Sequence, residues 1–391
     1  MQNSDIKDHV PHECESFSLP SLAPVLPISG RYAGRITSPI HGCFEMDLRI
    51  DVDPLHENSI VCHCISWDLT QLFEDVIANR SCRWRVDRGS WILQSPDVKT
   101  NELGVEIQGA AIKWNTAHSE TQVWIRIPRN EPRLSLAQVT LDDGATVSTY
   151  QCEWQSHYFR DVALQIDVCA PVNLEPVLPR YDTPQRTLTI ESVYADAGIN
   201  VTINTQQKLI EDEARAWTPG ELHQTMEDHF SELSGSPQWK LWGLIAGRFQ
   251  KPNVAGIMFN RAELGSNLPE RRGFAVFREH DSFDGLKPDE PGMQQTEASR
   301  KYLHTFIHEI GHAFNLQHSW EKDRPNALSW MNTAANYDER NGQGSFWCEF
   351  DFRFDYEELV HLRHGSHSSV VFGGDVLGRG NENDPLQKTK R

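Results

Sequence analysis

YLHTFIHEIGHAFNLQHSW, residues 302–320, is the stretch from which the organisation of this chain is best understood. It contains His308, Glu309 and His312, with His318 further along. On a helix, residues four apart lie on one face, so His308 and His312 can present two imidazoles to the same metal ion. Glu309 is rotated off that face, where a carboxylate can orient a water molecule instead of binding the metal.

The third histidine requires a sharp turn of the chain. His318 lies six residues after His312, about 1.7 helical turns, so a continuous helix would direct it to the opposite side. The residue at the turn must tolerate a left-handed conformation, which Gly adopts best and Asn next best; Asn315 stands at this place. With His318 turned back, three neutral imidazoles leave a tetrahedral zinc ion with one open position, as a catalytic site requires.

This HExxHxxNxxH pattern resembles the long motif of the metzincin clan of zinc metalloendopeptidases, which has Gly or, less often, Asn at the turn. Members of the clan also carry a methionine-containing turn beneath the metal, and Met331 is placed to provide this Met-turn. The resemblance covers roughly the second half of the chain. It implies a twisted mixed sheet, an active-site helix, the Met-turn and a C-terminal helix.

The activity that the resemblance implies is hydrolysis of peptide bonds in a protein or peptide substrate. One catalytic Zn²⁺ would be held by His308, His312 and His318, and Glu309 would be the general base. The alternative is a catalytically inert or latent zincin that acts as a protein-binding module or as a trigger-dependent effector.

Two further functional assignments follow from the same resemblance. In metzincins the edge strand of the sheet pairs with extended substrate, and the stretch Gly273, Phe274, Ala275, Val276, Phe277 is the candidate for that strand. Some relatives have a Tyr two residues after the Met of the turn, which moves to the metal or the oxyanion. Thr333 occupies that position here, so Tyr337 is the substitute considered for the oxyanion role.

Other histidines are expected to serve packing. His304 precedes His308 by four residues and extends the row of histidines along the helix. The outer two of three successive turns lie about 11 Å apart, too far to share one ion. His361, His364 and His367 are interpreted as surface or packing residues, because the three histidines of the motif already complete a site.

Composition restricts the class of protein. The 391 residues carry a net charge of −18 and are 38% hydrophobic, which argues against nucleic-acid binding because that requires a basic surface. No apolar run is long enough to span a bilayer, and the first residues lack the basic and apolar segments of a secretory signal. We therefore expect a cytoplasmic protein, while secretion from a longer precursor or by a non-signal route stays open.

The chain divides into segments of different pattern. Residues 1–27 form an expected irregular leader, and residues 28–170 contain many short alternating segments and turns without helices. This pattern is typical of a β-sandwich or barrel, and we expect a sandwich-like domain that could dock a protein partner. Residues 171–185 are Pro-rich and predict a linker.

The remainder, residues 186–377, alternates helices with apolar strands and predicts the metzincin-like domain of a multidomain α+β protein, followed by a disordered tail at 378–391. Helices are expected near residues 188–197, from Thr218, and from Asp355. The acidic loop at 278–295 could bind calcium, but no regular ligand spacing supports this, and we expect a solvated loop.

Overall fold

The computed structural model describes residues 28–378 apart from internal gaps. The gaps are residues 39–41, 53–61, 78–79, 88–90, 94–95, 102, 114–120, 129–135, 143, 146, 171–177, 205–208, 212–215, 234–237, 260–270, 285 and 287–296. In strand residues 35–38, 42–44, 62–87, 112–113, 170, 209 and 211 only the backbone is described. The expected leader, part of the expected linker and the expected tail beyond Gly378 lie outside the described residues.

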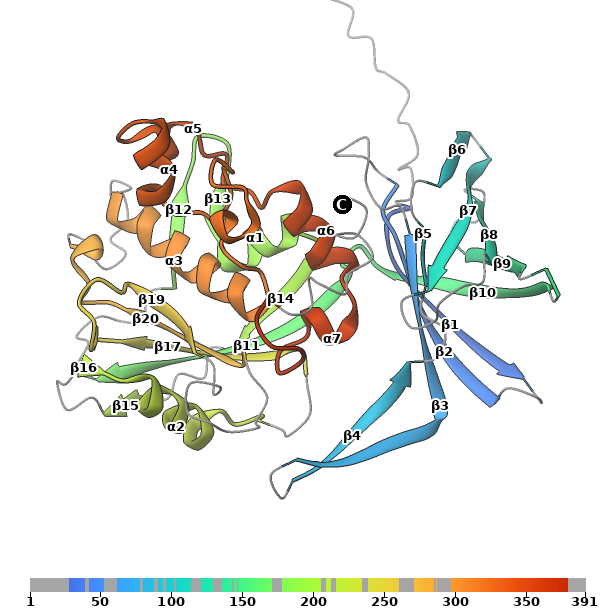
Figure 1. Cartoon of the computed structure of the whole chain (residues 1–391), viewed down its shortest axis with the longest axis horizontal. Helices are drawn as coiled ribbons and strands as arrows, with labels where there is room; N and C mark the ends of the chain where they lie inside the picture. Colours follow the sequence, from blue (N-terminus) through green and yellow to red (C-terminus); the bar gives the residue numbers. More distant parts are fainter. Residues whose placement is uncertain are drawn as a thin grey trace, which may run out of the picture.

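The described chain is a mixed α+β structure with two large sheets (Figure 1). The first sheet is antiparallel throughout its described pairings, in the order β2-β1-β10-β9-β8-β7-β5-β3-β4 with β6 beside β7. Its strands are β1 (Gly30–Ser38), β2 (Gly42–Ile50), β3 (Cys62–Ile77), β4 (Arg80–Asp87), β5 (Trp91–Leu93), β6 (Asp97–Asn101), β7 (Gly104–Lys113), β8 (Thr121–Pro128), β9 (Leu136–Asp142) and β10 (Val147–Ser156).

This first sheet corrects the sandwich-like expectation. Its strands form one sheet that curls into a half-barrel, and an extra pairing of β2 with β3 joins strands far apart in the order. Alternation along β8 buries Val123, Ile125 and Ile127 on the inner side and leaves Trp124 and Arg126 outside. Alternation was therefore predicted correctly, but a sandwich and a curled sheet share this pattern, and only the long-range pairing separates them.

The second sheet has the order β14-β11-β17-β20-β19, with β15 also beside β11. All its described pairings are parallel except that of β19 with β20. Its strands are β11 (Arg160–Ala170), β14 (Ile199–Asn204), β15 (Leu209–Glu211), β17 (Lys240–Ala246), β19 (Gly256–Phe259) and β20 (Gly273–Phe277). Two small pairs complete the strands: β12 (Arg180–Asp182) with β13 (Thr187–Thr189), and β16 (Ala216–Trp217) with β18 (Arg248–Phe249).

The position of β11 moves the expected domain boundary. The sequence placed residues up to 170 in the N-terminal β-domain, but β11 pairs with β14 and β17 in the second sheet, so the change of sheet falls between β10 and β11. Its polar positions are buried: Gln165 donates to the carbonyl of His229 at 3.1 Å, and Trp242 donates to Asp167 at 2.8 Å. In a sequence, a strand with hydrogen-bonded polar residues on one buried face shows the same alternation as a strand with one exposed face.

Helices cover both faces of the second sheet. Those described are α1 (Ile190–Asp196), α2 (Pro219–His229), α3 (Glu297–Ala313), α4 (Ala334–Asn341), α5 (Ser345–Glu349), α6 (Tyr356–His364) and α7 (His367–Val370), with 3-10 turns at Asp281–Phe283 and Ser319–Lys322. In Figure 1, α1 and α3 lie on one side of the sheet and α2 on the other. No helix in the described part of the chain is long and apolar enough to cross a membrane.

Local sequence explains where three of these helices begin. Thr189, Thr218 and Asp355 each accept a hydrogen bond from a backbone N–H in the first helical turn. In each case the residue three positions later bonds back to the cap, which satisfies two backbone donors that a helix end would leave free. The predicted starts at Thr218 and Asp355 and the short helix near residues 188–197 are confirmed.

The edge-strand assignment was wrong. The stretch Gly273, Phe274, Ala275, Val276, Phe277 forms β20, which pairs with β17 on one side and with β19 on the other. All five residues are buried, as in a central strand covered on both faces. Among the described strands, β19 is the edge on this side of the sheet, because the chain folds back to place β20 inside it.

The N-terminal sheet contacts helix α6. Arg363 donates to Asp51 Oδ2 at 3.0 Å, and His364 Nε2 lies 3.4 Å from the same oxygen. Arg49 donates to the Arg363 carbonyl at 3.2 Å, and Ile92 packs against Val360. The N-terminal sheet therefore contacts the last turn of α6 through a buried charged cluster.

We expect Asp51→Asn to lower the free energy of unfolding by about 3 kcal/mol at pH 7, because it leaves Arg363 without its buried carboxylate. Burial opposes ionisation of Asp51, but the hydrogen bond and charge of His364, together with Arg363, lower the pKa of its carboxyl below the ordinary value. The stabilisation by the ionised Asp51 carboxylate is thus fully present above the unfolded-state pKa of about 3.9, and it is lost as pH falls through the folded-state pKa.

Urea unfolding at several pH values measures this effect. The control is Asp161→Asn, which removes another contact between the sheets: Asp161 pairs with Arg31 at 2.9 Å, with side chains 52% and 32% exposed. It should cost less than about 1 kcal/mol. Equal losses in the two variants would contradict the importance of the buried cluster.

Candidate metal centre

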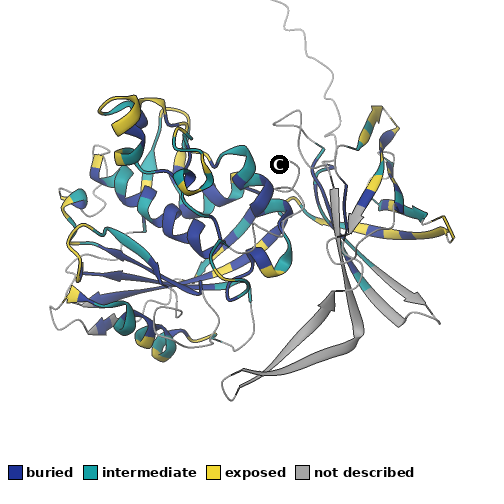
Figure 2. Cartoon of the chain, in the orientation of Figure 1, coloured by how far each residue is buried: buried dark blue, intermediate teal, exposed yellow. Residues whose placement is uncertain are grey.

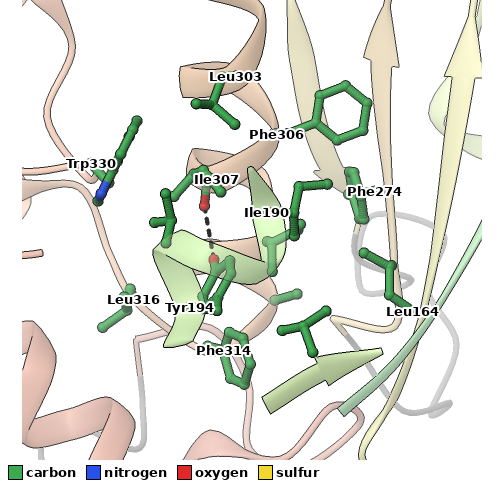
Figure 3. Close-up of a cluster of buried hydrophobic side chains, with 14 of the residues drawn as sticks. Leu164, Ile190, Tyr194, Phe274, Leu303, Phe306, Ile307, Phe314, Leu316 and Trp330 are labelled. Carbon is green, nitrogen blue, oxygen red and sulfur yellow. Dashed lines mark hydrogen bonds between the residues drawn. The ribbon is translucent and has the colours of Figure 1, made fainter. Parts of the chain in front are cut away.

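Helix α3 carries the motif through the core of the molecule. From Tyr302 to Ala313 all but one residue, Thr305, is buried, and Figure 2 shows the helix dark along this length. Leu303, Phe306 and Ile307 contribute to the cluster shown in Figure 3. There the hydroxyl of Tyr194 donates to the Ile307 carbonyl at 3.0 Å, which ties α1 to α3 next to His308.

The first two predicted ligands lie on one face of α3, as expected. The Nε2 atoms of His308 and His312 are 3.1 Å apart. Nδ1 of His308 lies 2.8 Å from the carbonyl of Trp330, and Nδ1 of His312 lies 2.7 Å from the carbonyl of Leu316. A carbonyl only accepts, so each Nδ1 carries the proton and each Nε2 presents a bare lone pair.

Burial keeps these imidazoles neutral. It lowers the pKa of His312 to about 3 and that of His308 well below its ordinary value. Two bare nitrogens at 3.1 Å repel each other unless a cation lies near both.

Asn315 makes the predicted turn. Its φ is +70°, in the left-handed region, and its N–H donates to the His312 carbonyl at 2.9 Å as α3 ends. The side chain is also used, since Nδ2 donates to the Ser369 carbonyl at 2.9 Å and Oδ1 accepts from the Gly378 N–H at 2.7 Å. Asn serves here both for its conformation and for its two hydrogen bonds.

The turn returns His318 to the other two histidines. Its Nε2 lies 3.1 Å from Nε2 of His312, and Nδ1 lies 3.1 Å from Oε2 of Glu321. The ring stacks on Trp320 with centroids 4.1 Å apart. The carboxylate of Glu321 favours the proton on Nδ1, so the third Nε2 is also bare.

Glu309 is buried beside this group, next to the edge strand β19. Burial raises the pKa of its carboxyl to about 8, although a hydrogen bond from the backbone of Met258 opposes the increase. Gly256 gives the carboxylate room, because a Cβ there would lie 2.9 Å from Glu309 Cγ and 2.5 Å from Thr305 Cγ2. A bound dication would lower the pKa again, toward the ionised form that accepts a proton.

Met331 is fully buried close to the end of α3. A Cβ on Gly311 would lie 2.4 Å from its sulfur, so the thioether packs against the backbone one residue before His312. The Met331 carbonyl accepts from the Ser319 N–H at 3.0 Å, next to His318. The Met331 turn thus contacts the segments of all three histidines, since its neighbour Trp330 receives the His308 bond.

The remaining histidines do not join the group. His304 stacks on His308 with centroids 5.7 Å apart and is buried among aromatic rings. His361 Nε2 lies 2.9 Å from the Phe314 carbonyl, and His364 contacts Asp51. In the described part of the chain, the metal-type cluster consists of His308, His312 and His318. Much of the acidic loop considered for calcium lies outside that part.

Tyr337 is not placed for the oxyanion role considered above. Its hydroxyl donates to Glu349 Oε2 at 2.8 Å, and its ring packs against Phe346. The side chain therefore joins α4 to α5 and has no described contact with the three imidazoles. Thr333, in the position that the resemblance assigns to Tyr, is the N-cap of α4.

The three imidazoles fit a zinc ion. Nitrogens about 2.1 Å from one tetrahedral ion lie about 3.4 Å apart, close to the two observed separations of 3.1 Å. A backbone carbonyl fixes the orientation of the first two rings through Nδ1, and the Glu321 carboxylate lies 3.1 Å from Nδ1 of the third. The chain was also compared with known proteins: no model of a protein family and no curated protein matches it.

Sequence reasoning missed several residues around the centre. Gly256 could have been found by a general signal, because a Gly within a strand often marks the close approach of another group. Glu321 follows His318 by three residues, a spacing that brings two side chains together in one helical turn. The contact between Ser329 and Glu358 has no local signal, because 29 residues separate them.

Variants of Asn315 should separate its two functions. Asn315→Gly keeps the left-handed turn but loses both side-chain hydrogen bonds, and we expect a loss of about 1–2 kcal/mol in the free energy of unfolding. Asn315→Ala also places a Cβ in the left-handed conformation and should cost about 1 kcal/mol more. Guanidinium unfolding in the presence of a chelator measures both, and an Ala variant as stable as the Gly variant would contradict the turn assignment.

Proposed function

We propose that this chain is a zinc-dependent endopeptidase of the metzincin type, which hydrolyses peptide bonds in protein substrates. One observation carries the proposal: three imidazoles with bare Nε2 atoms converge, with 3.1 Å between neighbouring atoms, beside a buried glutamate. A structural zinc site is closed by four protein ligands, whereas three ligands leave a position for reacting groups. Nothing else in the described chain offers a fourth ligand to this cluster.

The residues divide the chemistry among them. A zinc ion held there would lower the pKa of a water molecule and polarise the scissile carbonyl. Glu309 accepts the proton of the attacking water and then delivers it to the leaving amine nitrogen, as the C–N bond breaks. Burial raises the pKa of its carboxyl and a bound dication would lower it, and a carboxyl whose pKa lies near neutrality both takes up and releases protons readily.

The edge strand β19 suggests how a substrate is presented. Its described pairing is with β20 alone, and Gly256 at its start lies against Glu309. An extended peptide that added to the free side of β19 would run past α3 at the level of the glutamate. The substrate strand proposed is therefore β19, in place of β20.

The order of elements supports the same proposal. A mixed sheet with an antiparallel edge precedes α3, the Met331 turn follows it, and α6 comes later, after α4 and α5. This is the order that the metzincin resemblance implies. The inert or latent alternative shares these features, so only activity distinguishes the two.

We expect Glu309→Gln to bind Zn²⁺ with the same 1:1 stoichiometry as the native protein while cleavage of casein falls by about 10²–10⁴-fold. The amide fills the same space but cannot accept a proton. Metal content by mass spectrometry and release of fluorescent peptides measure the two effects. Glu339→Gln, at an exposed position of α4, is the control.

Two results would count against an active peptidase. Equal cleavage by native protein and Glu309→Gln would remove Glu309 from the mechanism. A native protein that binds Zn²⁺ but cleaves neither casein nor a library of unfolded peptides would favour the inert module.

A further inference from the structure

Glu358 on α6 has a buried carboxylate whose contacts go beyond those of a helix cap. The residue is 1% exposed. Oε2 accepts from the Ser329 hydroxyl and, at 3.0 Å, from the Asp355 N–H. Oε1 accepts from Lys322 Nζ at 3.0 Å, and Arg324 lies 3.8 Å away. In a capping box this residue needs only the contact with the Asp355 N–H. The contacts with Ser329 and Lys322 must therefore have another function.

The partners of Glu358 lie on the two segments that orient the predicted ligands. Ser329 Oγ accepts the N–H of Met331 at 3.0 Å, in the turn whose Trp330 carbonyl holds His308. Lys322 ends the 3-10 turn that begins directly after His318. One carboxylate thus links the Met331 turn and the segment behind His318 to the same helix.

Charge gives Glu358 a second effect. The Lys322 side chain is only 12% exposed, and it belongs to the 3-10 turn that follows His318 directly. Its ammonium group is therefore held on the segment that carries the third predicted ligand. Without the carboxylate, this positive charge would oppose binding of a dication.

We propose that Glu358 is a positioning residue of the metal centre: it holds the Met331 turn and the segment after His318 in register and neutralises Lys322. The inference rests on the proposed zinc site, but not on peptidase activity. It predicts that metal affinity depends on a side chain that does not touch the metal ligands.

The test is zinc affinity by competition with a chromophoric chelator, together with the absorption spectrum of the Co²⁺-loaded protein. We expect Glu358→Gln to weaken Zn²⁺ binding by about 10–100-fold and to change the Co²⁺ spectrum. Gln retains a hydrogen bond to Ser329 but not the negative charge. Glu357→Gln is the matched control on the same helix, with a side chain 42% exposed, and should leave both readouts unchanged.

The double variant Glu358→Gln/Lys322→Met separates charge from folding. Removing the unpaired ammonium should restore Zn²⁺ affinity at least threefold relative to Glu358→Gln. Native affinity and spectrum in Glu358→Gln, or no recovery in the double variant, would overturn the proposal. These readouts are independent of cleavage, so a zinc-binding protein without peptidase activity would refute the proposed function alone.

Discussion

Repulsion among three imidazole nitrogens that face one another without a proton between them determines how the segments around α3 must be built. Lone pairs 3.1 Å apart repel, so the rings must be fixed from behind. Each ring has an oxygen from a different place in the chain near its Nδ1: the Trp330 and Leu316 carbonyls and the Glu321 carboxylate. The geometry of the centre is therefore set by the segments that supply these oxygens, more than by α3 itself.

These supporting segments are held in turn by groups from distant parts of the sequence. The loop after α3 is fixed by the hydrogen bond from Asn315 Nδ2 to the Ser369 carbonyl, and the Phe314 carbonyl contacts His361. Arg271, which is fully buried, donates to the Ala313 carbonyl at 2.6 Å and to the Val371 carbonyl at 3.0 Å. Buried polar groups of this kind specify one arrangement, because any other leaves a donor or acceptor without a partner.

The parts of the fold that the sequence predicted are those governed by local rules. Capping by Thr218 and Asp355 and the turn at Asn315 depend on residues within a few positions of each other, and all three are present.

The predictions that were wrong depend on strand pairing between residues far apart in the sequence. Alternation in β11 could not reveal its sheet, because Gln165 and Asp167 are buried with partners. The apolar residues of β20 suit a central strand better than an edge strand. They do not show which strands pair with it on either side. Glu358 could be predicted as a capping partner but not as the partner of Ser329.

Helix α6 gives the N-terminal sheet a structural relation to the candidate metal centre. Its first turn holds Glu358 against the Met331 turn, and its last turn receives Asp51 and Arg49 from the first sheet. Arg160 from β11 donates to the Leu362 carbonyl at 2.6 Å and to the Gly365 carbonyl at 2.8 Å, which fixes the end of the helix from the second sheet. Because a helix of nine residues is short and stiff, a shift at one end displaces the other. The contact of the N-terminal sheet with α6 thus restricts the position of Glu358, and this structural role requires no docking partner.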